Sequence, residues 1–540
     1  MAAEGSTESI LELVQQQLSV PTWWTSGTAL VTGIAAATVL LHIATGSRYG
    51  FDRDELMALE DARHLAWGYV QYPPLTAFFG RIALALFGTS LVGFRFFAAL
   101  VQALALLLTG LMAKEFGGNK WAQIVAALAG VPFCLGAGAL MQYISFDYIC
   151  WVFVAYAMVR LLKSGNPRWW LAVGAGIGLG MMAKYTMGFF ALGVVAGVLF
   201  TPARKFLRSG WSWLGVLLSI AVFLPNLLWQ WQHNFVSLDF LRFLHLRDVG
   251  AGQTDWFLPG QLEVTLLAFP LAVAGVCFCL FLPQEKSWRP LAWMYLVPLA
   301  LLFALRGRDY YLAPAYPMLY AAGAVWLEQK LNAYAANRAS LRPANPAVLP
   351  IVSRRPLDSP EKSQRAGRLI FAALILDIVI AAVLALPIAP VGSRWFELAS
   401  RVDPVFPEEV GWRQFVKSIA QVRDALTPEE RAHLGILAGN YGEVGALNLY
   451  GEELGLPHAI SGVNSSWERG YGEPPPETVI VIGYSGEFLR QEFSSCYVAG
   501  ETWNRFGVAN EESSQVPDIF VCSGLKEPWP QFWLRARRFA

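Results

Sequence analysis

Apolar and polar residues are unevenly spread along this chain, with long apolar runs separated by short polar segments over its first 390 positions. A helix needs about 20 apolar residues to cross the hydrocarbon core of a bilayer, and irregular backbone cannot face lipid. Runs of this kind predict about eleven membrane-spanning helices. They lie near residues 25–46, 91–113, 120–140, 145–162, 168–182, 187–202, 211–230, 260–282, 290–305, 312–330 and 369–389.

The composition agrees with this pattern, because 55% of the residues are hydrophobic, only 15% are charged and the mean hydropathy is +0.41. A soluble domain of this length does not accommodate such a composition. We therefore expect a polytopic α-helical membrane protein. The net charge of +1 indicates neither a nucleic acid nor an acidic partner. The first apolar run lacks the basic flank and cleavage site of a signal peptide, so we expect it to remain as a span.

Lys and Arg residues concentrate in every second loop, which predicts that these loops are cytoplasmic. The loop after the tenth span, 331–368, also carries cations and is rich in Pro and Ala, as is typical of a flexible linker. This orientation places the first outer loop, 47–74, and the residues after 390 outside the cytoplasm. The cations of the other cytoplasmic loops are Lys114, Lys120, Lys163, Arg168, Arg204, Lys205, Arg208, Lys286 and Arg289.

The composition changes to that of a soluble domain after the last apolar run. Residues 1–389 are therefore predicted to form a membrane domain, and residues 390–540 a small extracytoplasmic α/β domain. The turn at 439–442 could hold an anion at a helix N-terminus, although such a turn is more often only a turn. The predicted strands lie at 433–438, 478–482 and 518–521, and a helix is predicted at 443–454.

The six cysteines fall into two groups. Cys496 and Cys522 lie in the predicted outer domain, where an oxidising compartment could join them, and the sequence leaves both possibilities open. The other four lie in apolar spans, where packing is the ordinary role of a cysteine. They are Cys134, Cys150, Cys277 and Cys279.

A cluster of acids follows the first predicted span. Charged residues at a membrane boundary are costly to hold and usually mark a functional site. A helix predicted over 55–67 would place Glu60 and His64 on one face. The alternative is an interfacial amphipathic helix with a solvated acidic face. The acids are Asp52, Asp54, Glu55, Glu60 and Asp61, with Arg53 and His64 beside them.

Further polar groups fall at the predicted outer ends of other spans. Asp147 lies at the junction of two spans, Lys184 lies between two short apolar runs, and Arg308 precedes two tyrosines. A terminal lysine often only reaches toward the interface, but Arg and Tyr side chains also match phosphate oxygens well. The loop between the seventh and eighth spans adds His233, Arg242, His245, Arg247 and Asp248.

A divalent cation is possible but undecided. Carboxylate and imidazole groups together suit such an ion, and Glu55, Asp147 and His245 are the candidates. The sequence does not show that these side chains meet.

Several of these residues belong to motifs that occur in a recognisable order. They are Asp54-Glu55, Tyr72-Pro73-Pro74-Leu75, Asp147, Lys184 and the segment 309–317, DYYLAPAYP. Their order and spacing resemble the bacterial relatives of protein O-mannosyltransferases. Lipid A aminoarabinose transferases, of the same GT-C superfamily, are also similar. The resemblance covers roughly residues 45–320.

The resemblance implies a GT-C-like membrane domain and the transfer of a sugar from a polyprenyl-phosphate donor to an envelope acceptor. The acceptor stays open among lipid A, another glycan, a lipid and a protein. The reaction is expected on the outer side of the bacterial inner membrane, with inversion at the anomeric carbon.

The resemblance also implies roles for single residues. Asp54 is expected to be the general base, and Glu55 and Asp147 are further catalytic candidates. Tyr72 stands where the aminoarabinose transferases carry a lysine before the Pro-Pro pair, so one phosphate contact is absent or replaced. The candidates for binding the donor phosphate are Arg53, Tyr72, Lys184, Arg308, Tyr310 and Tyr311.

Two other functions remain as alternatives. In a transporter or flippase, the acids and Lys184 would line a path for an ion or a lipid headgroup. A non-catalytic scaffold would display the outer domain but would leave the acid cluster without a purpose. Most of the unusual charge gathers at one surface and no segment is duplicated, which favours the transferase. Asp377, inside the last span, is expected to face the bundle and to find a hydrogen-bond partner.

Overall fold

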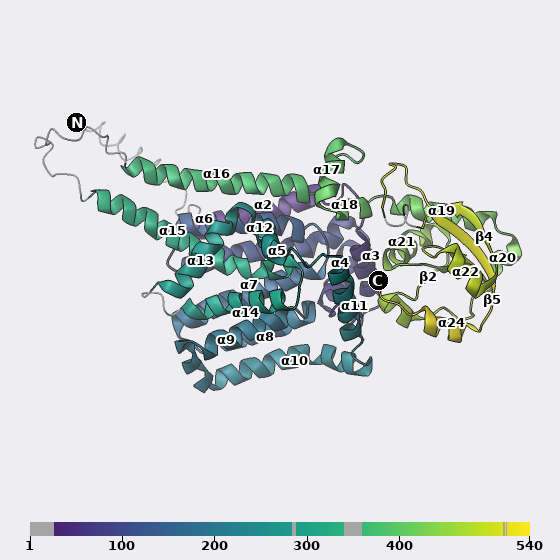
Figure 1. Cartoon of the computed structure of the whole chain (residues 1–540), viewed down its shortest axis with the longest axis horizontal. Coiled ribbons are helices and arrows are strands. Elements are labelled where there is room, and N and C mark those ends of the chain that lie inside the picture. Colours follow the sequence, from purple (N-terminus) through teal and green to yellow (C-terminus); the bar gives the residue numbers. More distant parts are fainter. Residues whose placement is uncertain (1–25, 283–287, 340–358, 511–513, 515) are drawn as a thin grey trace, which may run out of the picture.

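The structure is a computed structural model that describes residues 26–282, 288–339, 359–510, 514 and 516–540. Long helices lie side by side in a bundle, and a smaller domain with a β-sheet sits at one end of it (Figure 1). The far end of α15 and the start of α16 lie at the opposite end of the bundle. The bundle and the smaller domain, called the outer domain below, follow one another along the long axis of the molecule (Figure 1).

The bundle is built from helices that overlap every predicted span. Small residues let several of them approach closely, as is usual in membrane bundles. A Cβ atom on Gly174 would lie 1.9 Å from the carbonyl oxygen of Gly215, and one on Gly275 would lie 2.1 Å from that of Leu319. The helices are α2 Gly27–Thr45, α5 Leu91–Glu115, α6 Lys120–Ala137, α7 Tyr143–Ser164, α8 Trp169–Ala183, α9 Met187–Leu199, α10 Gly210–Gln232, α12 Phe257–Thr265, α13 Phe269–Phe281, α14 Arg289–Ala304, α15 Tyr316–Ala339 and α16 Ser359–Ala385.

Within the described ranges, seven helices are long and apolar enough to cross a membrane, or eight if a bent pair counts as one span. The bent pair joins Met187–Leu199 to Pro202–Arg208 at 99°. α8 and α14 are apolar but have only 15 and 16 residues. The membrane class of the fold is therefore confirmed, whereas the predicted number of eleven spans is not.

The helices also extend into the predicted linker at 331–368. α15 continues to Ala339 and α16 begins at Ser359, so both are longer than the apolar runs suggested. The remaining part, 340–358, lies outside the described residues. Asp377 on α16 is fully buried, as expected, but neither of its carboxylate oxygens has the predicted hydrogen-bond partner among the residues that the structure describes.

The acid cluster lies on a short helix, α3 (Arg53–Arg63), at the end of the bundle nearest the outer domain. Asp52 caps this helix: its side chain accepts from a backbone N–H, and the Glu55 side chain accepts from the N–H of Asp52. Such a reciprocal cap explains why the helix begins two residues earlier than predicted. After α3 the chain turns through Pro73 and enters α4 (Leu75–Phe87).

The outer domain has a five-stranded sheet in the order β2-β1-β3-β5-β4. β1 pairs in parallel with β2 and β3, whereas β5 pairs antiparallel with β3 and β4. Helices surround the sheet. The elements are α17 Arg394–Val402, α18 Val405–Glu408, α19 Trp412–Ala425, α20 Pro428–Ala432, β1 Leu434–Leu437, α21 Tyr441–Tyr450, β2 Ala459–Ile460, β3 Thr478–Val481, α22 Gly486–Glu492, β4 Phe493–Glu501, β5 Asp518–Leu525 and α24 Trp529–Ala536.

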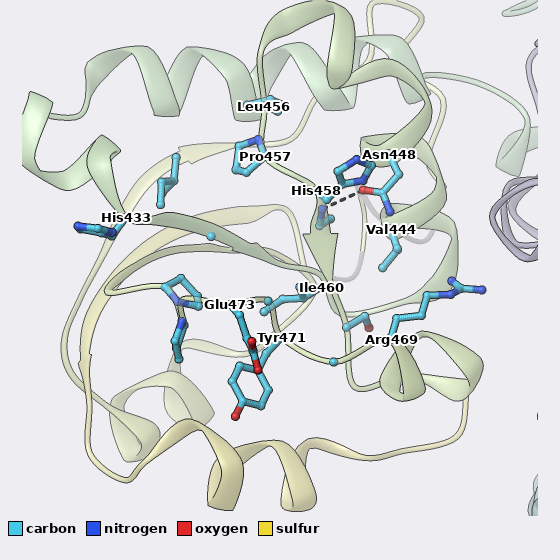
Figure 2. A pocket seen from close by; sticks show the side chains of 18 of the residues that line it. His433, Val444, Asn448, Leu456, Pro457, His458, Ile460, Arg469, Tyr471 and Glu473 are labelled. Atoms are coloured by element: carbon cyan, nitrogen blue, oxygen red, sulfur yellow. Dashed lines mark hydrogen bonds between the residues drawn. The ribbon is translucent and has the colours of Figure 1, made fainter. Parts of the chain in front are cut away.

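α21 attaches the outer domain to α3. A Cβ atom on Gly445 would lie 2.6 Å from the Leu56 carbonyl oxygen, and one on Gly442 would lie 2.9 Å from the Arg53 Cβ. The two helices therefore touch through their backbones. A polar cavity opens beside this contact, with Asn448 and Arg469 on one side and His433 on the other (Figure 2).

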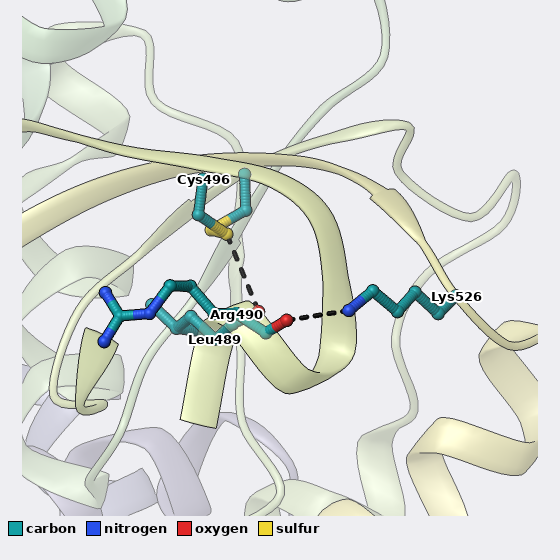
Figure 3. Close-up of a disulfide and its surroundings, with 5 residues drawn as sticks. Leu489, Arg490, Cys496 and Lys526 are labelled. Carbon is teal, nitrogen blue, oxygen red and sulfur yellow. Dashed lines mark hydrogen bonds between the residues drawn. A yellow bond between two sulfur atoms is a disulfide. The ribbon is translucent and has the colours of Figure 1, made fainter. Parts of the chain in front are cut away.

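Cys496 and Cys522 form a disulfide, which decides the question that the sequence left open (Figure 3). The two residues are direct partners across the antiparallel pair of β4 and β5. Nearby, Lys526 Nζ donates to the carbonyl oxygen of Arg490 at 2.7 Å. The disulfide thus ties the edge strand β4 to the sheet.

Candidate active site

A cavity of about 390 Å³ lies at the junction of the bundle and the outer domain. The membrane domain supplies most of its wall, including side chains from α3, α7 and the segments that follow α8 and α14. The outer domain supplies Tyr441, Asn464 and the C-terminal Ala540. The lining from the membrane domain includes Asp54, Met57, Tyr72, Tyr143, Lys184, Thr186, Arg308 and Tyr311.

Asp54 presents a carboxylate to this cavity from the first turn of α3. Its Oδ1 accepts from the Tyr441 hydroxyl at 3.1 Å, and its Oδ2 accepts from Gln142 Nε2 at 3.4 Å. Burial raises the pKa of Asp54, while Arg53 and the Tyr441 hydroxyl act in the opposite direction. A raised pKa makes a carboxylate a stronger base, as a general base requires.

Glu55 has a different environment, although it is the next residue. Its side chain is fully buried, and both oxygens accept from Arg95 at 2.6 to 3.1 Å. Oε1 also accepts from the backbone N–H of Met141 at 2.8 Å. Arg95 binds Glu409 of the outer segment as well, at 2.9 Å. Glu55 therefore forms a buried ion pair and is not part of the cavity lining, and its catalytic role stays a prediction.

Lys184 lies in a cage of aromatic rings. Its Nζ is 3.8 Å from the ring centroid of Tyr311, 5.1 Å from that of Tyr143 and 5.3 Å from that of Tyr310. Ammonium groups over ring faces at such distances are stabilised electrostatically. The cage holds the Lys184 ammonium group at the cavity wall.

Asp147 is buried behind this wall. Its Oδ1 accepts from Trp151 Nε1 and its Oδ2 from the Thr186 hydroxyl, both at 2.9 Å. Thr186 and Lys184 line the cavity, whereas Asp147 does not belong to the lining. Both oxygens of Asp147 are hydrogen-bonded, and the carboxylate fixes the segment that carries Lys184; its catalytic role stays a prediction.

Arg308 forms a two-pronged ion pair that the sequence did not predict. Its Nε donates to Asp248 Oδ2 at 2.7 Å and its Nη2 donates to Oδ1 at 2.8 Å. Burial alone would lower the pKa of Arg308, but the bonds to Asp248 outweigh it and raise that pKa. Nη1 contacts the Tyr310 hydroxyl at 3.4 Å. Asp248, on α11 (Val236–Gly250), therefore orients the guanidinium group in the cavity wall.

Two other candidates for phosphate binding are engaged elsewhere. The Tyr72 hydroxyl donates to Asp61 Oδ2 at 2.6 Å, so the ring lines the cavity while the hydroxyl points into the protein. The Arg53 guanidinium lies 4.9 Å from the ring centroid of Tyr441. The Tyr72 hydroxyl and the Arg53 guanidinium thus already have partners within the protein, and their contact with the donor phosphate stays a prediction.

The possible metal site does not form in this arrangement. Over the described parts of the chain, no group of three or more His, Cys, Asp or Glu residues is placed to hold an ion. His245 is exposed on α11, whereas Glu55 is buried against Arg95. The residues present do not fit a cation at Glu55 and His245.

Tyr441 is the functional candidate that sequence reasoning missed. It is the first residue of α21 and lies within the turn at 439–442, where the sequence indicated a possible anion site. The turn is already satisfied, since Glu443 Oε2 accepts from the N–H groups of Gly439 and Asn440 at 2.7 and 3.1 Å. The first residue of α21 instead places the Tyr441 hydroxyl within hydrogen-bond distance of Asp54. A glycine-rich turn before a helix was the available signal, but it indicated the wrong ligand.

Comparison with known proteins shows which families and structures the chain is similar to. A family model described as dolichyl-phosphate-mannose-protein mannosyltransferase matches residues 71–229. The structure of ArnT from Cupriavidus metallidurans bound to undecaprenyl phosphate superposes with a TM-score of 0.55 at 15% identity, covering 93% of this chain and 98% of that chain. At this identity the likeness shows the fold.

Two curated relatives are transferases. The lipid A galacturonosyltransferase RgtD of Rhizobium johnstonii is 25% identical over 221 residues, which are 39% of this chain and 44% of that protein. The undecaprenyl phosphate-alpha-4-amino-4-deoxy-L-arabinose arabinosyl transferase 1 of Pseudomonas fluorescens is 25% identical over 318 residues, 54% of this chain and 55% of that protein. The chain spans about half the length of the curated relatives it matches. The resemblance predicted from the motifs is confirmed.

Proposed function

We propose that this protein is an integral inner-membrane glycosyltransferase that moves a sugar from a polyprenyl-phosphate donor to an envelope acceptor, with lipid A as the first candidate. One observation carries this proposal: the carboxylate of Asp54 and the cations of Lys184 and Arg308 line the same cavity. A base for the acceptor and cations for a phosphate are the two requirements of such a transfer. The cavity opens, in this proposal, to the periplasmic side.

Asp54 acts on the acceptor. An acceptor hydroxyl gives its proton to the Asp54 carboxylate as its oxygen forms a bond to the anomeric carbon of the donor sugar. The bond between that carbon and the phosphate oxygen breaks, and its electron pair stays on the phosphate. Attack from the face opposite the leaving group inverts the anomeric carbon. General base assistance of this kind typically contributes 10²–10⁴-fold to the rate.

Lys184 and Arg308 act on the leaving group. The lipid phosphate gains negative charge as the sugar departs, so cations held in place before the reaction stabilise the transition state. The aromatic cage fixes Lys184, and Asp248 fixes Arg308. The Tyr311 ring lies 3.8 Å from Lys184 Nζ and also lines the cavity. Asp147 lies outside the cavity. It supports this arrangement by accepting a hydrogen bond from the Thr186 hydroxyl.

The transferase is favoured over the transporter alternative by two observations. Both curated relatives are named as transferases that modify lipid A or use undecaprenyl phosphate. In addition, the charged groups of the cavity gather at one end of the bundle, beneath the outer domain, instead of along a path through it.

A donor screen tests the proposal. The full chain, reconstituted in lipid, is supplied with a panel of polyprenyl-phosphate sugars and with lipid A, and products are followed by mass spectrometry. Transfer of one sugar to lipid A that requires the lipid-linked donor is the expected result. Movement of the donor across the bilayer without any transfer would refute the proposal in favour of a flippase.

A further inference from the structure

A second cavity, of about 1040 Å³, lies in the outer domain next to the end of α3, with His433, Asn448, His458 and Arg469 around it (Figure 2). We call it the outer cavity. Its floor includes Glu60 and His64 from the last turns of α3 and Asn448 from α21, and its walls come from the loops at 455–461 and 469–476. Glu60 follows Asp54 by six residues, which is about 9 Å along a helix axis. The outer cavity therefore begins close to the proposed transfer site without sharing its lining.

Glu60 has a buried carboxylate oxygen in the floor of the outer cavity that could accept a hydrogen bond. Its side chain is only 5% exposed. Its Oε1 accepts from Asn448 Nδ2 at 3.2 Å, whereas Oε2 receives no hydrogen bond from any residue that the structure describes. A buried oxygen without a donor is costly. A ligand that carries hydroxyl groups would remove this cost by donating to it.

The charges and the apolar parts of the wall narrow the class of ligand. Three arginines are matched by three acids, so the cavity has no net positive charge that would select a phosphate. Apolar surface is contributed by Leu456, Pro457 and the prolines at 474–476. A neutral ligand with many hydroxyls and apolar C–H faces, such as a saccharide, suits both features. The charged residues are Arg423, Arg431, Arg469, Glu60, Asp424 and Glu473.

Arg469 joins the outer cavity to the transfer site. Its guanidinium binds Asp61, and its Nη1 lies 3.7 Å from Glu60 Oε1. Asp61 in turn accepts from the Tyr72 hydroxyl at 2.6 Å, and the Tyr72 ring lines the transfer cavity. One buried polar chain thus runs from the floor of the outer cavity to the wall where the donor is expected.

We propose that the outer cavity binds the saccharide portion of the acceptor and holds it beside the transfer site. This inference rests on the proposed function, because only a transferase has an acceptor. The binding of a saccharide, however, can be measured without any turnover. It gives the outer domain a defined task, which is recognition of the acceptor by its sugars.

The test uses the full chain in lipid nanodiscs and a lipid-free oligosaccharide made of uncharged core sugars. Binding is measured by titration calorimetry, and hydrogen exchange is followed in the loop at 469–476. His458 lines the outer cavity and is exposed, so His458→Trp fills the space with little risk to the fold. Lys417→Trp, on the exposed face of α19 and outside both linings, is the matched control.

We expect the oligosaccharide to slow exchange in the loop and to bind at least tenfold more weakly to His458→Trp than to the control. Glu60→Gln is a second variant, in which the loss of a charged acceptor should weaken binding about tenfold. Equal binding by wild type, His458→Trp and Glu60→Gln would overturn the inference. Binding of inorganic phosphate in place of the oligosaccharide would overturn it as well.

The outcomes separate this inference from the proposed function. If the wild-type chain binds the oligosaccharide but transfers no sugar in the donor screen, the function is refuted and the saccharide site stands. If the chain transfers sugar with the same KM to lipid A with and without its core sugars, and does not bind the oligosaccharide, the outer cavity inference fails alone.

Discussion

The two faces of α3 show how differently neighbouring acids are used. On the face toward the bundle, Glu55 is fully buried and bound to Arg95 by bonds as short as 2.6 Å. On the face toward the cavity, Asp54 is partly exposed and has only two longer bonds, at 3.1 and 3.4 Å. The first acid is saturated with partners, while the second retains capacity for a substrate.

The saturated face holds the site together. Arg95 on α5 binds Glu55 on α3 and Glu409 at the start of the outer domain, so one guanidinium connects three segments. Burial raises the pKa of Glu409 to about 7, although Arg95 acts to lower it. An acid that stabilises the fold can therefore be the direct sequence neighbour of an acid that acts on a substrate. The difference between them is whether a buried cation binds the carboxylate.

The largest expected effect is on catalysis, from Asp54→Asn. An asparagine keeps the shape but cannot take the acceptor proton, so transfer should fall by roughly 10²–10⁴-fold. Membranes containing the variant, supplied with lipid-linked donor, provide the measurement. The protein should accumulate as the wild type does. Near-normal turnover would remove Asp54 from the role of base.

Glu55→Gln tests the other face and should act on stability. Arg95 would lose its closest charged partner while it stays buried, which typically costs about 3–5 kcal/mol. The expected result is a lower unfolding temperature and poor accumulation, measured by thermal unfolding in detergent. Asp54→Asn serves as the control, because its stability should be close to wild type. A Glu55→Gln protein that is stable but inactive would contradict this distinction and would indicate that Glu55 takes part in the reaction.

Much of this arrangement could be predicted from the sequence, because it depends on local pattern. Apolar runs located the helices, and the motifs located Asp54, Lys184, Arg308 and Tyr311, which line one cavity. The number of spans could not be predicted, since several apolar helices are shorter than a bilayer requires.

Partners that are distant in sequence could not be predicted. Arg95 lies 40 positions from Glu55, and Tyr441 lies 387 positions from Asp54. No local sequence pattern indicates which acid will bind a cation or a hydroxyl group from a distant part of the chain. For this reason, the sequence grouped Glu55 and Asp147 with Asp54, although both are saturated by buried donors.

Arg308→Ala tests whether the cations of the cavity bind the donor phosphate. If Arg308 stabilises the phosphate, its loss should weaken donor binding by roughly 10- to 100-fold, because bonds to charged groups are worth about 1.5–3 kcal/mol. Acceptor binding should change less. Arg306→Ala is the matched control, since Arg306 is 56% exposed and contacts only the exposed Asp255 among the described ion pairs. Equal losses for donor and acceptor would contradict the assignment.

The smallest expected effect comes from Tyr441→Phe, which removes one hydrogen bond from Asp54. The Tyr441 hydroxyl favours the charged carboxylate and so lowers its pKa. Without it the pKa of Asp54 rises further, and the carboxylate is protonated at a higher pH. Because the base must be deprotonated, the acidic limb of the kcat/KM profile should move to higher pH, with a loss of roughly two- to tenfold on that limb.

Tyr450→Phe is the control for this profile, because Tyr450 ends the same helix and packs under Arg413. Its acidic limb should coincide with that of the wild type. A Tyr441→Phe profile that falls uniformly at every pH would mean that the hydroxyl positions α21 and does not tune the carboxylate. The outer domain would then support the transfer site only by its packing against α3, and the contrast between the two faces of that helix would depend on the membrane domain alone.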